Sequence, residues 1–157
     1  MPKEGKQHHH IDSSVMIGVF LTRDEKDREA CIYYCDLIGR KYAGSSSIES
    51  LGEVAKKFGT VLTDKKAREE AFVFLGDFIF KQRLNICFTD EEDLDLAKEL
   101  KGLNYTCDMA ELISLAVAIR DHAEVFMILD RGMLGNSTFI SEVKSRYKIA
   151  IKKPQLI

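Results

Sequence analysis

Glu111 is the side chain whose surroundings point most directly to chemistry. It is the only charged residue between Met109 and Ile119, a segment apolar enough to predict a buried helix. Burying an isolated carboxylate costs several kcal/mol unless a positive group compensates it, and no Lys or Arg lies within one helical turn on either side. Asp108 and Ser114 stand three residues before and after Glu111, so the three polar side chains share one stripe of the helix. The sequence therefore predicts a polar site on this helix.

Three further acids stand where the strands and helices of an α/β fold would meet. Asp12 follows the segment HHHI, Asp130 follows the apolar run VFMIL, and Glu53 falls in the first turns of a helix expected at 48–58. An unbroken apolar run is typical of a buried parallel strand, and ligands of open parallel sheets bind beyond the carboxyl ends of the strands. Each acid also has an ordinary local explanation, because Asp12 could cap the following helix and Glu53 could pair with a neighbouring lysine.

Taken together, the four acids predict a site for a hard cation. Four carboxylates in a small volume repel one another by about 1 to 4 kcal/mol per pair unless a cation neutralises them. All-oxygen ligation favours Mg²⁺ or Mn²⁺ over Zn²⁺, and such ions polarise phosphates and activate water for in-line attack on a phosphodiester. Since no Cys–His or Ser–His nucleophile pair is apparent in the sequence, we expect metal-dependent hydrolysis.

The apolar periodicity predicts helices that alternate with short strands. Helices are expected at 13–21, 23–42, 48–58, 64–81, 90–100, 109–119 and 136–146, and strands at 8–11, 84–88, 125–129 and 147–151. The three serines 45–47 are expected to form a short extended piece or a cap, and Gly132 with Gly135 a tight turn. This alternation predicts an α/β fold with a mostly parallel central sheet.

The length and charge of the chain limit the classes of protein it can be. Its 157 residues suit one domain, which we expect at 8–157 after a flexible polar segment at 1–7. The formal net charge of -2 excludes a strongly basic nucleic-acid-binding coat. No apolar run approaches the roughly 18 residues that a membrane span needs, and the first ten residues are too polar for a signal peptide. We therefore expect a cytoplasmic protein with no membrane contact.

The cysteines and the histidine tract have several interpretations. The four cysteines lack CxxC spacing and are expected to be reduced core residues, although Cys31 and Cys35 could share a helix face and bind a soft metal. The tract His8-His9-His10 could be a non-native remnant, a metal site, or the start of a strand.

Three segments of the chain resemble the motifs of the PIN-domain ribonucleases. IDSSVMIG at 11–18 resembles the family's opening strand, with its leading Asp and following hydroxyl residues. SSSIESLGEV at 45–54 resembles the second motif, whose acid would be Glu53, and ELISLAVAIRDHAEVFMILD at 111–130 is similar to the third and fourth motifs joined. The third acid of the family is commonly Asp; here Glu111 fits the usual spacing to Asp130, while Asp108 lies one turn earlier, and either could be the ligand.

The resemblance implies a three-layer α/β/α sandwich and a metal-dependent endoribonuclease, often the toxin of a toxin–antitoxin pair and usually dimeric. The implied catalytic residues are Asp12, Glu53, Glu111 and Asp130, and the implied ligands of Mg or Mn are these four and Asp108. Substrate RNA is expected to contact Ser13, Ser14 and the basic Arg131, with Arg23, Lys56 and Lys57 as further basic residues near the acids. The implied partners are RNA, an antitoxin protein and a second copy of the chain.

Other functions remain open on the sequence. An inactive PIN-like scaffold could bind RNA or a protein without binding metal, an α/β interaction protein could use the acids only as caps and surface residues, and a DNA nuclease could use the same chemistry. One further pattern predicts a homodimer, because a helix with so much aromatic surface usually meets a partner. The residues of this stripe are Phe72, Phe74, Leu75, Phe78, Ile79 and Phe80.

Overall fold

A parallel sheet forms the centre of the molecule. The computed structural model describes residues 5–156, so most of the segment expected to be flexible, residues 1–4, lies outside the described residues. The strands are β1 (Gln7–Ile11), β2 (Tyr42–Ser47), β3 (Asn85–Cys87), β4 (Val125–Met127) and β5 (Ala150–Lys152). Their order across the sheet is β3-β2-β1-β4-β5, and each neighbouring pair is parallel. The expected α/β fold with a parallel central sheet is therefore confirmed.

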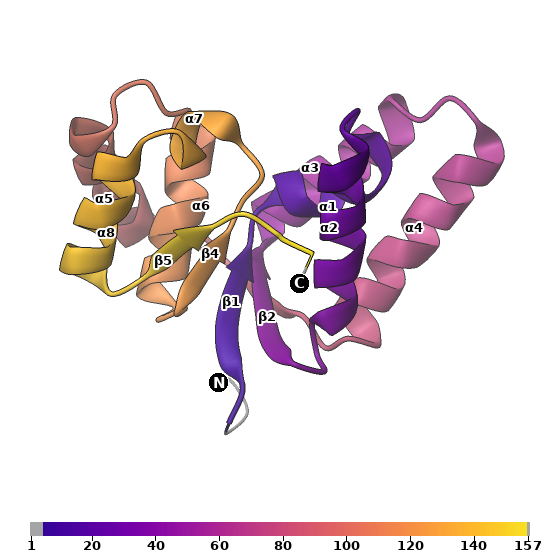
Figure 1. Cartoon of the computed structure of the whole chain (residues 1–157), viewed down its shortest axis with the longest axis horizontal. Coiled ribbons are helices and arrows are strands. Elements are labelled where there is room, and N and C mark those ends of the chain that lie inside the picture. The colour runs from indigo at the N-terminus through magenta and orange to yellow at the C-terminus, as the bar shows by residue number, and fades with distance from the viewer. Residues whose placement is uncertain (1–4, 157) are drawn as a thin grey trace.

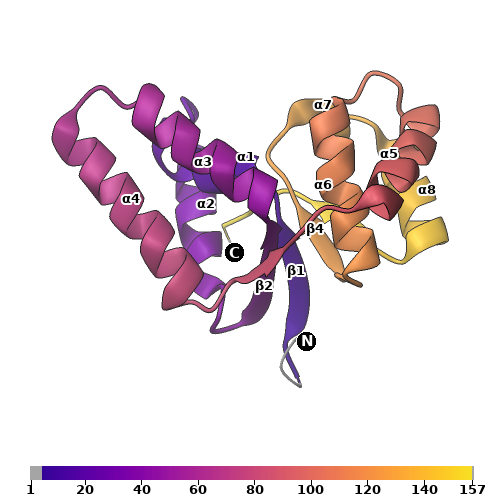
Figure 2. The same ribbon diagram turned by 180° about the vertical axis from the view of Figure 1, so that it is seen from behind.

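Two groups of helices cover the sheet from opposite sides (Figures 1 and 2). The first group is α1 (Ser13–Leu21), α2 (Glu25–Leu37), α3 (Ile48–Thr60) and α4 (Lys65–Phe80). The second group is α5 (Glu91–Leu103), α6 (Met109–Arg120), α7 (Arg131–Leu134) and α8 (Ser137–Tyr147). Figure 2 shows the connection from α4 through β3 to α5 crossing from one group to the other. Within the described part of the chain, no helix is long and apolar enough to span a membrane.

Each group of helices has its own apolar core, and β4 contributes to both. Val125 and Met127 pack in the core with α1 to α4, whereas Phe126 and Ile128 pack in the core with α5 to α8. This division follows from the pleat of a strand, which directs alternate side chains to opposite faces. The same alternation in β1 directs His10 toward Phe126, with ring centroids 6.0 Å apart, and His9 toward Tyr42, at 3.9 Å. The histidine tract is thus a buried strand.

Several boundaries differ from those expected. The helix expected to reach residue 42 ends at Leu37, because Gly39 adopts a φ of +86° and its N–H donates to the carbonyl oxygen of Tyr42 at 2.7 Å. The last helix continues to Tyr147 and ends where Lys148 is left-handed, so the final strand begins only at Ala150. The segment expected to be a turn around Gly132 forms the short helix α7.

Candidate active site

The carboxyl ends of β1 and β4 lie side by side at the point where the strand order reverses. Asp12 follows β1 directly, and its backbone N–H donates to the carbonyl oxygen of Met127 at the end of β4, at 3.0 Å. Leu129, two residues further along the chain, donates its N–H to the Ser14 hydroxyl at 2.9 Å. These bonds fix the start of α1 against the segment that carries Asp130. Switch points of this kind are the usual ligand sites of open α/β sheets.

A single pocket at this edge of the sheet contains all five acids that the sequence analysis identified. Its volume is about 480 Å³. The acids come from five places in the chain: after β1, on α3, before α6, in the first turn of α6, and before α7. They are Asp12, Glu53, Asp108, Glu111 and Asp130. The structure therefore brings together residues that are far apart in sequence.

Asp12 is buried at the N-terminus of α1. Its side chain caps this helix by accepting the N–H of Ser14 at 3.0 Å, so the expected local role coexists with a position in the pocket. Burial raises the pKa of Asp12, the bonds from Ser14 oppose this shift, and the negative charge of Glu53 adds to it. Glu53 is exposed, and its Oε2 accepts the hydroxyl of Ser13 at 3.0 Å. Ser13 thus holds Glu53 on the side of Asp12.

The pKa of Glu111 is affected by the charges of both Asp12 and Asp130. Burial raises its pKa to about 7, a bond from Cys107 opposes the shift, and the charges of Asp130 and Asp12 add to it. The Cys107 thiol donates to Oε2 of Glu111 at 3.3 Å. Mutual repulsion of this kind shows that the carboxylates are close enough to affect one another's ionisation.

Asp130 is held by the helix that follows it. Its Oδ2 accepts the N–H of Met133 at 3.2 Å and so caps α7. A Cβ atom on residue 132 would lie only 2.9 Å from the same oxygen, so Gly132 leaves the carboxylate the space that a larger residue would take. Asp108 differs from the other acids, because it is exposed and caps α6 by accepting the N–H of Ala110 at 3.2 Å.

The donors in the pocket fit a hard cation. All five acids offer oxygen, which is what Mg²⁺ and Mn²⁺ prefer. The Ser114 hydroxyl is buried beside Asp12 and helps to lower the pKa of that carboxyl group, although it makes no hydrogen bond of standard geometry within residues 5–156. Among residues 5–156, no three acids of the pocket have ligand atoms that all lie within 4.8 Å of one another. The group of side chains that meets this criterion lies elsewhere. An ion or an ordered water between the acids would offset their mutual repulsion.

Solved structures with the same backbone arrangement exist among toxin–antitoxin proteins. No family profile and no curated protein sequence matches this chain. It is similar to VapBC2 from Rickettsia felis bound to a DNA fragment from its promoter, with a TM-score of 0.60, 12% identity, and 94% of this chain and 98% of that chain covered. It is also similar to FitAcB from Neisseria gonorrhoeae, with a TM-score of 0.60, 16% identity, and 93% and 97% covered. Mycobacterium tuberculosis VapC20, a sarcin–ricin loop cleaving toxin, matches with a TM-score of 0.58, 12% identity, and 90% and 98% covered.

The chain has the PIN-domain fold. At these identities the likeness shows the fold, and the predicted three-layer arrangement is confirmed by it. The roles of individual residues depend on the pocket itself.

The residues expected to contact substrate lie partly inside the pocket lining and partly outside it. Lys57, from α3, lines the pocket of this PIN fold. Arg131 and Arg23 are exposed and lie outside the lining. Ser13 and Ser14 do line the pocket, but their hydroxyls already bind Glu53 and the backbone of Leu129.

Two side chains near the acids, Cys107 and Ser114, have partners in the pocket that the sequence did not predict. Cys107 stands four residues before Glu111, which places it within reach of the helix's first turn, although nothing in its residue type indicates a contact with a carboxyl group. Ser114 is on the polar stripe noted for this helix, and the structure adds that it faces Asp12. The polar stripe in the sequence indicated that Ser114 would lie near the site, but it could not identify Asp12 as the residue that Ser114 faces.

Proposed function

We propose that this protein is a metal-dependent endoribonuclease that hydrolyses RNA phosphodiester bonds. The observation that carries the proposal is the convergence of four acids from separate segments on one pocket, where burial and mutual charge raise the pKa values of Asp12 and Glu111. A structural role does not require such an arrangement, because each acid would be more stable alone in water.

Asp12, Glu111 and Asp130 are the proposed ligands of Mg²⁺ or Mn²⁺, with Glu53 as the fourth acid. Asp108 remains the alternative to Glu111. A bound divalent ion would polarise the scissile phosphate and activate a water molecule for attack. Its positive charge would also lower the pKa values of the carboxyl groups around it, so that Glu111 would be ionised at neutral pH.

The remaining residues of the pocket position these groups. Ser13 orients Glu53 through the hydroxyl bond, and Ser14 holds the end of β4 against α1. Lys57 supplies the positive charge within the lining that would attract an RNA phosphate. Arg131 could contact RNA beyond the pocket, because it is exposed directly after Asp130.

We further propose that the protein is the toxin of a toxin–antitoxin pair and acts in the cytoplasm. The similar solved structures include VapBC2 and FitAB bound to DNA and a toxin–antitoxin complex from Klebsiella pneumoniae. The VapC20 toxin, which cleaves the sarcin–ricin loop, supports RNA over DNA as the substrate.

A cleavage assay on end-labelled single-stranded and hairpin RNAs tests the proposal. We expect cleavage with Mg²⁺ or Mn²⁺, none in excess chelator, and a loss of at least about 100-fold in Asp12→Asn. Asp64→Asn is the matched control, because Asp64 caps α4 outside the pocket and Asn preserves a cap. Cleavage that persists in chelator or in Asp12→Asn contradicts the proposal, and cleavage of DNA oligonucleotides in place of RNA would reassign the substrate.

A further inference from the structure

A second group of metal-binding side chains lies on the face of the sheet that packs against α6. It consists of His10 from β1, Cys87 from the end of β3, and Asp121, the residue that ends α6. One potential ligand atom from each of the three lies within 4.8 Å of the other two. None of the three lines the acidic pocket, so the cluster is separate from the proposed active site.

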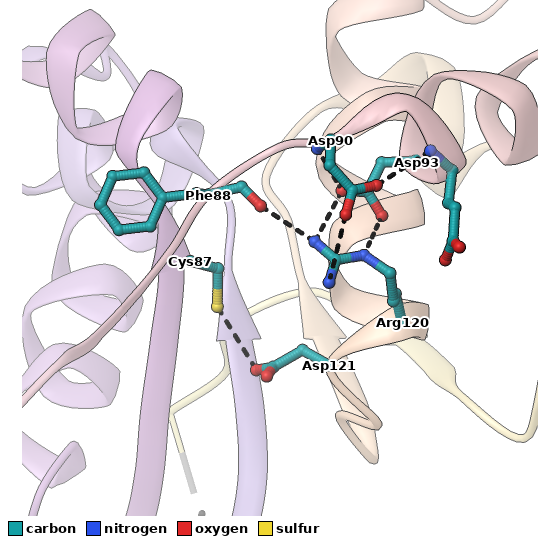
Figure 3. A network of polar contacts seen from close by, with 7 residues as sticks. Cys87, Phe88, Asp90, Asp93, Arg120 and Asp121 are labelled. Carbon is teal, nitrogen blue, oxygen red and sulfur yellow. Dashed lines mark hydrogen bonds and ion pairs between the residues drawn. The ribbon is translucent and has the colours of Figure 1, made fainter.

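The thiol and the carboxylate of the cluster are close enough to share one ion. Figure 3 shows the Cys87 thiol pointing toward the Asp121 carboxylate. The sulfur donates to Oδ2 of Asp121 at 3.4 Å. Nε2 of His8 lies 3.2 Å from the same oxygen, so a second histidine of the tract borders the group. Ligands at the bond lengths of a tetrahedral zinc site would stand about 3.3 to 3.8 Å apart.

Hydrogen bonding leaves His10 incompletely satisfied. Its side chain is fully buried, Nδ1 meets the Ser45 hydroxyl at 3.0 Å, and Nε2 has no hydrogen-bond partner among the described residues. Within the part of the chain that the structure describes, Nδ1 of His8 is also buried without a hydrogen-bond partner. A buried ring nitrogen with no partner has lost its water without a replacement, which is a cost that a bound ion would remove. Ser45, which bonds both rings, would fix the tautomer and orientation of the ligand.

The surrounding network holds Cys87 and Asp121 in position. Arg120, the neighbour of Asp121, donates to both carboxylate oxygens of Asp93, at 2.6 and 2.8 Å. The same guanidinium donates to the carbonyl oxygen of Phe88, the neighbour of Cys87, at 2.9 Å. Figure 3 shows this bridge directly above the thiol and carboxylate. Two of the three donors are therefore fixed by bonds at the adjacent residues, which reduces the reorganisation needed to bind an ion.

One side of the cluster borders a cavity of about 370 Å³, which is lined by His8, Asn85 and Asp121 among others. An ion entering this cavity would meet the His8 imidazole and the Asp121 carboxylate at the wall, whereas His10 and Cys87 do not line it.

We propose that His10, Cys87 and Asp121 form a site for a borderline-soft divalent transition metal of the Zn²⁺ class, with His8 or water in the fourth position. The mixed nitrogen, sulfur and oxygen donors select this class over Mg²⁺. Because the donors come from β1, β3 and the end of α6, the ion would link the sheet to the helix whose other end carries Glu111. The proposal does not depend on the ribonuclease activity.

Cobalt substitution tests the site through a signal that only a thiolate ligand gives. Reduced protein, stripped with chelator and desalted, is titrated with Co²⁺ and followed by absorbance. We expect a thiolate-to-cobalt charge-transfer band that saturates at one Co²⁺ per chain and is abolished by stoichiometric Zn²⁺. Co²⁺ held only by the acidic pocket would lack this band unless Cys107 were a ligand.

Two cysteine variants separate these sources. The band should vanish in Cys87→Ser and persist in Cys107→Ser, with circular dichroism showing that both variants fold. No band in the parent, a band retained in folded Cys87→Ser, or a band lost only in Cys107→Ser overturns the proposal.

A third variant decides the question if Cys87→Ser does not fold. Asp121→Asn keeps the shape of the side chain, and its Zn²⁺ affinity, measured by competition with a chromophoric chelator, should fall at least about tenfold. An unchanged affinity would overturn the assignment of Asp121 and, with it, the three-residue site.

Discussion

At the scale of the residue, the pKa of Glu111 reports how strongly burial and the neighbouring acids act on a carboxyl group in the pocket. The raised pKa of about 7, caused first by burial and then by the neighbouring acids, means that the folded protein holds this proton more tightly than the unfolded chain, whose value is near 4.5. Its contribution to stability is therefore complete below about pH 4.5 and is lost as the pH rises through about 7.

The first prediction concerns the pH dependence of stability in excess chelator. The melting temperature of the parent should fall between about pH 5 and pH 8 through this group, and Glu111→Gln should remove that part of the slope. Because Glu111 is partly exposed, the loss is about 1 kcal/mol, well below the full value of the shift. Glu99→Gln on the exposed face of α5 is the control and should change nothing. Parallel slopes for the parent and Glu111→Gln would contradict the prediction.

The second prediction distinguishes the two candidates for the third acid. The charges of both Asp12 and Asp130 raise the pKa of Glu111, whereas Asp108 is exposed and caps α6. Glu111→Gln should therefore reduce metal-dependent RNA cleavage by at least about 100-fold, and Asp108→Asn by less than about tenfold, since Asn keeps the cap. Initial rates at saturating Mn²⁺ measure both. A larger loss in Asp108→Asn would assign the ligand to Asp108.

At the scale of the element, Arg120 at the end of α6 forms ion pairs with Asp90 and Asp93 at the start of α5. Asp93 is fully buried, accepts two bonds from Arg120, and also accepts the N–H of Asp90 as part of the capping box of α5. Asp90 and Asp93 thus cap the N-terminus of α5 together. The added role of Asp93, as the partner of a basic residue on another helix, depends on the packing of α5 against α6.

The third prediction follows from leaving this carboxylate unpaired. Arg120→Ala should lower the free energy of unfolding by about 2 to 4 kcal/mol, because Asp93 would remain buried without its partner. Arg146→Ala is the matched control, since Arg146 pairs with Glu142 on the surface of α8, and it should cost less than about 0.5 kcal/mol. Urea unfolding measures both. Equal effects of the two substitutions would show that the pair is no stronger than a surface one.

The elements that the sequence predicted poorly are those whose partners are distant in the chain. The helix and strand positions of the acids followed from local periodicity, whereas β2 reads YAGSSS and lacks an apolar pattern. Its serines are buried because remote groups satisfy them: Ser46 donates to the carbonyl oxygen of Ile11 at 2.7 Å, and Ser45 meets His8 and His10. Such pairings depend on strand register, which one sequence does not reveal.

At the scale of the whole molecule, the pocket depends on both groups of helices. Asp12 and Glu53 belong to the side with α1 and α3, while Glu111 and Asp130 belong to the side with α6 and α7. The sequence predicted this meeting because the carboxyl ends of parallel strands share an edge. It could not predict that Arg131 would lie outside the pocket lining while Lys57 lies within it, because the positions of side chains relative to a pocket depend on tertiary packing.

The aromatic stripe of α4 is divided between the interior and the surface. Leu75 and Phe78 are buried in the core beside α1 to α3, so part of the stripe expected to meet a partner is already packed. Phe72, Val73 and Phe80 remain 44%, 63% and 80% exposed. Large exposed apolar side chains grouped on one helix are typical of an interface.

The fourth prediction is that α4 forms the contact of a homodimer. At tens of micromolar, light scattering should give twice the chain mass of 17.8 kDa. Phe80→Ser should raise the dissociation constant at least about tenfold, because a buried aromatic anchor contributes more than about 1 kcal/mol to an interface. Phe88→Ser is the control: Phe88 is 69% exposed but lies on the connection after β3, so its removal should leave the dimer intact. A monomeric parent, or equal weakening by both substitutions, would exclude α4 as the contact.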